Sequence, residues 1–327
     1  MSSRLSLTWP PHEPPGPRRF GFVLIPGFSL VALSCAVDVL RVARLEAPGA
    51  GFAWTLLAPD GAADAVASSS GVPLPVEPWP SPLDALVVVG GERTHLFRDE
   101  RLDRALRTAA RRGTMIGSLS DGAFLVAATG LFDGVRSTIH WKCQSAYRER
   151  HPSLDVRGSI LEIDGGRFSC AGGTASLDLM LCLVGRTLGW EAAGRIADNY
   201  VHDRLRGEEQ MQHESSGFRL VGRSPILAAA LTEMAASLEA PLSIGTLASR
   251  AGTSIRHLDR VFRRHLGVSP SRHYRDMRLV RASGLLRQSG LSVGEIALAC
   301  GFGSASHLAR HFRTKFGEPP SSYRRGG

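Results

Sequence analysis

Hydrophobic and polar positions follow two different patterns along this chain of 327 residues. In the first part, short continuous apolar runs alternate with stretches in which apolar residues recur at helical spacing. Continuous apolar strands separated by helices are typical of a parallel sheet that is covered on both faces. The pattern predicts an α/β, flavodoxin-like parallel-sheet domain. The runs that define it are FGFVLI, SLVALSCAVDVLRVARL, AWTLLA, DALVVVGG, DERLDRALRTAARR, TMIGSL and GAFLVAATG.

The last part of the chain predicts helices only, and one pattern occurs there twice. The copies span residues 243–270 and 292–320, and matching positions lie 49 apart at first and 50 apart after a one-residue insertion. Each copy reads as a short helix, a glycine turn and a second helix, which is the helix-turn-helix arrangement. We therefore expect an all-α domain with two such motifs, at 243–266 and 292–316.

Turn and capping residues mark the limits of these helices. Gly252 can adopt the positive φ that ends a helix in a tight turn, and Ser254 is a good N-cap for the second helix. Leu258 and Phe262, four residues apart, predict the buried face of that helix. The equivalent residues of the second copy are Gly301, Ser304, Leu308 and Phe312.

The opposite face of each second helix is basic and polar. Arginine can form two hydrogen bonds to guanine and can also neutralise phosphate, so this face suits a DNA major groove. A solvated basic face is the alternative for a single helix, and the duplication argues against it. The candidate DNA-binding residues are Arg256, Asp259, Arg260 and Arg263 in the first copy and Ser306, His307, Arg310 and Arg313 in the second.

The charge of the chain is concentrated in the same region. Residues 223–327 hold 16 basic and 6 acidic residues, a net charge of +10, whereas the rest of the chain holds 23 basic and 24 acidic residues. Such asymmetry predicts a polyanionic partner for one domain only. A membrane surface is the competing polyanion, but the chain has no apolar run long enough for a membrane span.

A single helix is expected between the two copies, over residues 271–288. At 1.5 Å per residue it would be about 27 Å long. Successive major-groove entries of B-DNA lie about 34 Å apart, so one chain could read two adjacent grooves.

These motifs resemble the AraC/XylS family of transcriptional regulators. The matching stretches are PLSIGTLASRAGTSIRHLDRVFRRHLGVSPSRHYRDMRL and SVGEIALACGFGSASHLARHFRTKFGEPPSSYR. The resemblance implies that side chains early in each second helix contact bases. It adds Ala305 to the candidates of the second copy, where small side chains imply that fewer bases are read. It also implies double-stranded promoter DNA and RNA polymerase as partners, with a role as an activator.

One turn in the first domain has the pattern of a nucleophile elbow. In TMIGSLSDGAFLVAATG, a strand runs into Ser120, Asp121 and Gly122 and then into a helix, which is the arrangement that aims one side chain over a sheet. With LFDGVRSTIHW and CAGGTASLDLMLCLVGRTLG, residues 20–205 resemble the PfpI-like branch of the class I glutamine amidotransferase superfamily, as found in AraC-type regulators of the GlxA type. The opening LIPGFSLVALSCAVDVLRVAR is similar to members that sense arginine, glycine betaine or carnitine.

An amidase or hydrolase that uses Ser120 is the alternative function. The superfamily nucleophile is usually cysteine, whereas a serine needs an adjacent base. His140 and Asp38 are available, but nothing in the sequence brings them to Ser120, and a buried, hydrogen-bonded His140 is the stronger expectation. We therefore predict a protein that is not an enzyme.

We expect instead a ligand-binding pocket without catalytic activity, at the edge of the sheet where the strands end. Aromatic walls and a carboxylate would suit an amine, amino acid or betaine. The alternatives are that Phe28 and Trp141 belong to the core, that Asp38 pairs with Arg41, and that Gly90 and Gly91 only make a turn. The candidate ligand-binding residues are Phe28, Ser29, Asp38, Gly91, Ser120, Asp121, His140 and Trp141.

The remaining segments complete the expected organisation. Residues 1–19 are rich in proline and predict a flexible tail, 206–224 predict a linker, and 225–325 form the DNA-binding domain. A helix at 191–205 either covers the sheet or mediates a dimer. Five scattered cysteines without metal-ligand spacing predict free thiols in a reducing cytoplasm, with no metal and no cofactor.

The sequence thus predicts a transcriptional regulator that a small-molecule effector controls, acting as a homodimer away from membranes. A DNA-binding protein whose first domain only dimerises is a further possibility.

Overall fold

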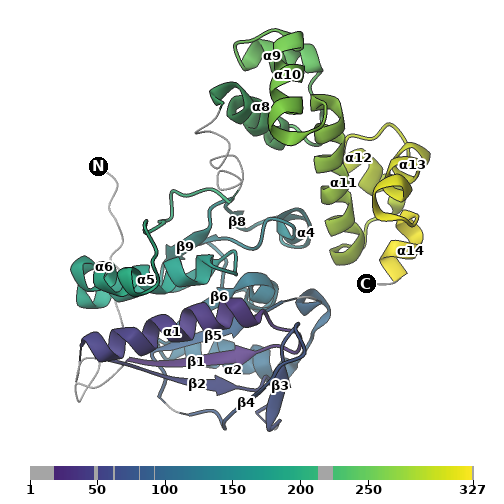
Figure 1. Ribbon diagram of the computed structural model, residues 1–327. Coiled ribbons are helices and arrows are strands. Elements are labelled where there is room, and N and C mark those ends of the chain that lie inside the picture. The colour runs from purple at the N-terminus through teal and green to yellow at the C-terminus, as the bar shows by residue number, and fades with distance from the viewer. Residues whose placement is uncertain are drawn as a thin grey trace. The chain divides into compact units, whose positions relative to one another are not determined.

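The computed structural model describes residues 18–47, 51–61, 63–80, 82–91, 93–212 and 224–325. The chain divides into two compact units, residues 1–211 and 212–327 (Figure 1). Only Arg18 and Arg19 of the expected tail are described, and they begin the first strand. Most of the expected linker lies outside the described residues, whereas residues 206–211 still belong to the first unit.

A six-stranded sheet forms the centre of the first unit, in the order β2-β1-β5-β6-β10-β9. All neighbours are parallel except β9, which pairs antiparallel with β10 at the edge. This confirms the parallel sheet and adds a short antiparallel hairpin. The strands are β1 (Arg18–Leu24), β2 (Phe52–Leu57), β5 (Ala85–Val89), β6 (Met115–Leu119), β9 (Leu161–Asp164) and β10 (Arg167–Cys170), with the small pairs β3 (Ala65–Ala67) and β4 (Pro73–Pro75), and β7 (Arg136–Ser137) and β8 (Asp155–Val156).

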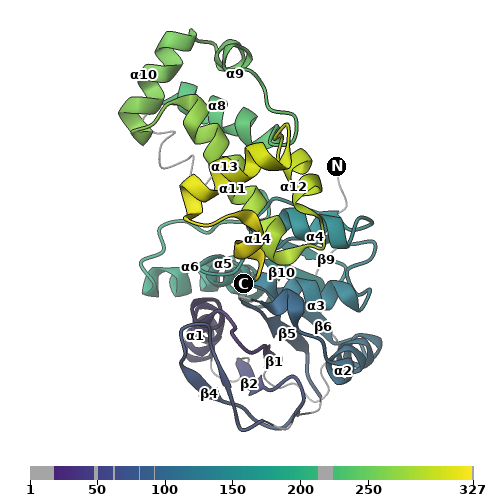
Figure 2. The same ribbon diagram turned by 90° about the vertical axis from the view of Figure 1, so that its right-hand side faces the viewer.

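Helices cover both faces of this sheet, because its strands are apolar on both sides. The helices α1 (Leu30–Glu46), α5 (Ala175–Leu188) and α6 (Trp190–Asn199) pack together on one face. On the other face, α2 (Glu100–Arg111) and α3 (Ala123–Ala128) pack against β6. Figure 2 shows the strands between these two layers. The remaining helical segments of the unit are η1 (Thr94–Leu96), η2 (Ser120–Gly122) and α4 (Gln144–Arg150).

The helix expected at 191–205 covers α1 and α5 but is shorter than predicted, since α6 ends at Asn199. A buried carboxylate from α5 holds the segment that follows. Asp178 Oδ1 lies 2.9 Å from Nε2 of His202 and accepts the backbone N–H of Arg206 at 3.1 Å. These long-range hydrogen bonds hold His202 and Arg206 against α5, and the helix ends before them.

The second unit consists of seven described helices. Two pairs form the helix-turn-helix motifs: α9 (Ile244–Arg250) with α10 (Ile255–Leu266), and α12 (Val293–Ala299) with α13 (Ala305–Phe316). The long helix α11 (Pro270–Gln288) contacts α10, α12 and α13, as the expected connection between the copies requires. The others are α8 (Pro225–Ala236), which packs against α9 and α10, and α14 (Pro320–Arg325).

The turn and cap predictions are confirmed in both motifs. Gly252 and Gly301 have φ of +66° and +68°. Ser254 Oγ accepts the backbone N–H of His257 at 3.2 Å, and Ser304 Oγ accepts that of His307 at 3.1 Å. The apolar residues predicted to form the buried faces of α10 and α13 are fully buried: Leu258, Phe262, Leu308 and Phe312.

Candidate DNA-binding surface and small-molecule site

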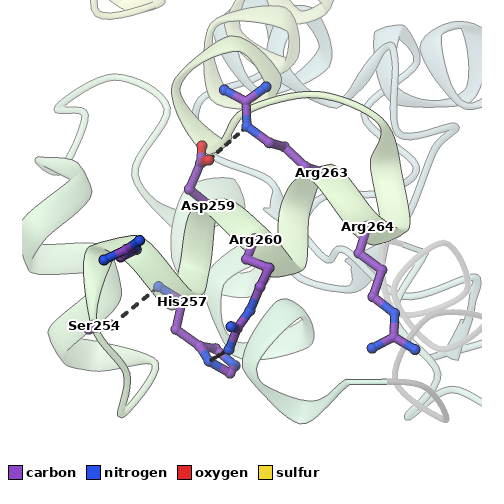
Figure 3. Close-up of a pocket in the computed structure, with 7 residues that line it drawn as sticks. Ser254, His257, Asp259, Arg260, Arg263 and Arg264 are labelled. Carbon is purple, nitrogen blue, oxygen red and sulfur yellow. Dashed lines mark hydrogen bonds and ion pairs between the residues drawn. The ribbon is translucent and has the colours of Figure 1, made fainter.

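The outer face of α10 carries the candidate DNA-binding residues of the first copy. Because Leu258, Val261 and Phe262 turn inward, the polar residues among them on the helix turn outward to solvent. Figure 3 shows the open hollow that these outward residues form on the helix surface. Its lining consists of Ser254, Arg256, His257, Asp259, Arg260, Arg263 and Arg264.

Two contacts orient the charged groups on this face. The Nε of Arg263 donates to Oδ2 of Asp259 at 2.7 Å, and Nη2 of Arg260 lies 2.8 Å from Nδ1 of His257. The two pairs project from different sides of α10 (Figure 3). The ion pair between Arg263 and Asp259 adds little stability, as is usual for exposed pairs. The effect of the two contacts is to orient the side chains of Arg260 and Asp259 on the face that would read base edges.

The equivalent face of α13 is arranged differently. Arg310, Arg313, Ser306 and His307 are exposed, and Ala305 is half-buried. Instead of an arginine, His307 faces another histidine: its Nε2 lies 3.1 Å from Nε2 of His311, and its ring stands edge-on to Phe302. The outer face of α13 therefore carries fewer exposed arginines than that of α10.

Burial and nearby cations both disfavour the protonated form of His311 on this face. Burial lowers the pKa of His311, and Arg275 lowers it further. We therefore expect a neutral His311 near pH 7, so that Arg310 and Arg313 carry the positive charge of this face.

Sequence reasoning overlooked His257 and Arg264, which also line the hollow on α10. A simple signal could have found the arginine, since Arg256, Arg260 and Arg264 recur every four residues and such residues share a helix face.

The elbow of the first unit has the predicted strained geometry. Ser120 has a φ of +55°, which is unusual for a residue other than glycine, and it begins η2 directly after β6. The turn is tightly packed: a Cβ placed on Gly172 would lie 2.5 Å from Cβ of Ser120. Ser120 and Asp121 are both buried.

Backbone contacts bring the loops that follow β1, β5 and β6 together at one edge of the sheet. Phe28 bridges to Gly91. The N–H of Ser29 donates to the Gly90 carbonyl at 3.0 Å, and the N–H of Gly90 donates to the Leu119 carbonyl at 3.1 Å. The segment after β7 joins them, because the Cys143 thiol donates to Oδ1 of Asp121 at 3.2 Å. Loops from far apart in the sequence thus surround the elbow.

The individual side chains at this edge differ in their surroundings. Phe28 is fully buried in the core, and Ser29 caps α1 by accepting the backbone N–H of Ala32. Trp141 is 36% exposed, so the alternative that it belongs to the core is wrong. His140 is only half-buried, with its ring centroid 5.6 Å from that of Trp141.

Asp38 does not join the elbow, and its place in the expected pocket is corrected. It lies in the middle of α1, eight residues or about 12 Å beyond the start of that helix. Its carboxylate pairs with Arg41 and accepts a hydrogen bond from the Tyr200 hydroxyl at 3.0 Å. The Arg41 contact is the alternative that the sequence had left open, and it lowers the pKa of Asp38.

A small cavity of about 280 Å³ lies beside the loop that follows β1. Its walls are apolar, but charged side chains stand at its rim. The charged residues of the lining are Asp60, Arg98 and Asp99, and Pro26 and Phe97 lie beside them.

The five cysteines are free thiols, and four of them are buried. Burial raises the pKa of Cys170 and of Cys182 to about 11 and that of Cys300 to about 12. Thiols in this state are poor nucleophiles. Within the described parts of the chain, no helix is both long and apolar enough to cross a membrane.

Two protein-family models match the chain. The DJ-1/PfpI family matches residues 18–184, and a helix-turn-helix domain matches residues 247–326.

Curated relatives match across nearly the whole chain. It is 38% identical to the HTH-type transcriptional regulator GlxA of Rhizobium meliloti, over 94% of this chain and 96% of the relative. It is 37% identical to the regulator CdhR of Pseudomonas aeruginosa, over 93% and 91%, and 33% identical to the regulator GbdR of the same species, over 98% and 88%.

Among solved structures, an AraC family transcriptional regulator from Pseudomonas putida aligns with a TM-score of 0.53 and 32% identity. The alignment covers 56% of this chain and 100% of that one. A DJ-1 superfamily protein from Salmonella typhimurium aligns with a TM-score of 0.50 and 20% identity, over 57% and 100%, which shows a shared fold.

Proposed function

Because this chain belongs to the AraC family of transcriptional regulators, in the group with an N-terminal DJ-1/PfpI domain, we propose that a small metabolite controls its binding to promoter DNA. It is a DNA-binding regulator and not an enzyme. The observation that supports DNA binding by this chain is the exposed, arginine-rich face of α10, which recurs with fewer arginines on α13. Its test is the preference of the full chain for a selected DNA site, with and without the metabolite.

We propose that base edges are contacted by the outward residues of both helices. In α10, Arg256 and Arg260 can each donate two hydrogen bonds to guanine, and Asp259 can accept one from cytosine. Arg263, farther along the helix, neutralises phosphate. In α13 the contacts come from Ala305, Ser306, His307 and Arg310, with Arg313 on phosphate.

The effector proposed for the first unit is an amino acid or a betaine-like amine. Trp141 offers an exposed aromatic face, and a cation already lies near it, since Nζ of Lys142 is 5.5 Å from the ring centroid. The Asp121 carboxylate lies at the adjoining elbow. An aromatic side chain and a carboxylate at one edge of the sheet suit a cationic group. The site comprises the loops that carry Phe28, Ser29, Gly91, Ser120, Asp121, His140 and Trp141.

Control follows from a shift between two populations of the protein. An effector that binds one arrangement of the first unit better than another favours that arrangement, and the DNA-binding unit responds through the coupling free energy between the two sites. We propose a homodimer that activates transcription with RNA polymerase. Five free cysteines support a place in the reducing cytoplasm.

The Trp141→Ala variant is expected to bind its effector about threefold to thirtyfold more weakly, which is the contribution of one cation–π contact. The measurement is isothermal titration calorimetry of the full chain against amino acids and betaines. Trp190→Ala is the matched control, because Trp190 is also exposed but lies on α6.

Two further variants locate the site. Asp38→Ala is expected to leave affinity unchanged, because Asp38 faces Arg41 and Tyr200. Arg98→Ala removes the cation at the rim of the small cavity beside β1. A loss of affinity in Arg98→Ala with none in Trp141→Ala would place the effector in that cavity and refute the elbow site.

A further inference from the structure

An apolar side chain stands exposed at the start of α10, among charged neighbours. Ile255 is the first residue of that helix, directly after the N-cap Ser254, and it is 55% exposed. Single exposed apolar residues are common on protein surfaces. This one differs by its position, because Asp259 lies four residues later on the same helix face. If Asp259 faces a base edge, Ile255 faces it as well.

The repeat supports the same placement. Ile255 and Ala305 occupy the same position in the two copies, 50 residues apart, and each begins its helix. The position at Ala305 is among those expected to contact bases. The first copy therefore offers a large apolar group where the second offers a single methyl group.

The side chain of Ile255 lies beside Gly245 of α9. The Cδ1 atom of Ile255 would lie 3.7 Å from a Cβ on Gly245 of α9, which is ordinary contact distance. A β-branched side chain is also stiff at χ1. Ile255 thus has α9 near it on one side and is open to solvent on the other.

The chemistry of the groove determines what such a group can read. The side chain of Ile255 has no hydrogen-bonding atom, so it cannot pair with the donors and acceptors of the bases. The C5-methyl group of thymine is the apolar group that the major-groove edges present. We propose that Ile255 recognises a thymine methyl group in the half-site read by the first helix-turn-helix motif, an inference that rests on the proposed DNA contacts of α10.

The test removes that methyl group and nothing else. A DNA site is first selected from a randomised library with the full chain, and each thymine of the site is then replaced by uracil in turn. Dissociation constants are measured by fluorescence anisotropy at about 150 mM salt. We expect one thymine in the first half-site at which the replacement weakens binding about fourfold, the effect of burying one methyl group.

Ile255→Ala should weaken binding to the thymine site by a similar factor and abolish the response to uracil. Such a double-mutant cycle isolates the contact between the side chain and the methyl group. Leu298→Ala is the matched control, because Leu298 is an exposed leucine of the same unit that lies on α12. That variant should keep the full response to uracil, and the far-ultraviolet circular dichroism of both variants should match that of the wild type.

The outcomes separate this inference from the function on which it rests. Specific binding without any thymine that responds to uracil would overturn the inference alone. So would a response that persists unchanged in Ile255→Ala. Wild-type protein that binds a scrambled fragment as tightly as the selected site would overturn the proposed DNA contacts and the inference together.

Discussion

The Arg260→Ala variant is expected to lose roughly tenfold to a hundredfold of its preference for the selected DNA site over a scrambled fragment, the contribution of one bidentate contact to guanine. His257 holds the Arg260 guanidinium at 2.8 Å, so this side chain is oriented before DNA arrives. Pre-orientation lowers the cost of ordering a long side chain on binding. The measurement is the dissociation constant of each fragment at about 150 mM salt.

The equivalent change in the second copy, Arg310→Ala, is expected to reduce this preference by a smaller factor. Its neighbour His307 faces His311 and Phe302, and Ala305 and Ala309 have no polar side-chain atoms. Arg250→Ala serves as the charge-matched control, because Arg250 is exposed on α9 and paired with Glu233. Arg250→Ala should weaken binding to both DNA fragments by the same small factor. Equal losses of preference in Arg260→Ala and Arg310→Ala would refute the prediction that the two motifs contribute unequally to DNA sequence preference.

The second large effect is expected in the first unit, where Gly90→Ala should destabilise the fold by about 3 kcal/mol or more. A Cβ on Gly90 would lie 2.1 Å from the backbone nitrogen of Gly122, and one on Gly122 would lie 2.2 Å from the Val88 carbonyl oxygen. Both clashes are with backbone atoms, which cannot rotate away. The elbow would therefore have to leave the end of β5.

Tryptophan fluorescence follows this unit selectively, since Trp9, Trp54, Trp79, Trp141 and Trp190 all belong to residues 1–211. The thermal midpoint should fall by about 6 °C or more for a domain of this size. Gly194→Ala is the matched control, because Gly194 lies inside α6 with no atom within 4 Å of its added Cβ. It should be neutral or slightly stabilising. An unchanged midpoint in Gly90→Ala would show that the elbow is not seated on β5 as described.

Long periodic segments made most of the fold predictable. The helix expected at 271–288 is found at Pro270–Gln288, and the apolar runs FGFVLI and DALVVVGG became β1 and β5. Such segments repeat the same signal over many residues. The short strands β3, β4, β7 and β8 have two or three residues each and carry no such signal.

The errors came from contacts between residues far apart in the sequence. The end of α6 depends on Asp178 in α5, which no local pattern near residue 200 could reveal. The sequence predicts Asp38 at the elbow because this residue belongs to the first loop-and-helix segment, but the length of α1 carries it away toward Tyr200. The elbow itself was predictable, because its strand–turn–helix pattern and its glycines lie within one short stretch.

The repeat made the DNA-binding surface easier to predict than the effector site. Two copies of one pattern show which positions are buried and which are exposed, and Leu258 with Leu308 and Phe262 with Phe312 follow that rule. Side-chain partners were not visible in the sequence. The orientation of Arg260 by His257, and of His307 toward His311, arises from helix geometry together with the choice of rotamers.

The most direct test of the account is the binding of the full chain to a selected promoter site and to a scrambled fragment of equal length, at about 150 mM salt, with and without the effector found by calorimetry. The account predicts a preference of about a thousandfold or more for the site and a change of at least about fivefold in its affinity when the effector is added. Equal affinities for the two fragments, unchanged by the effector, would contradict it.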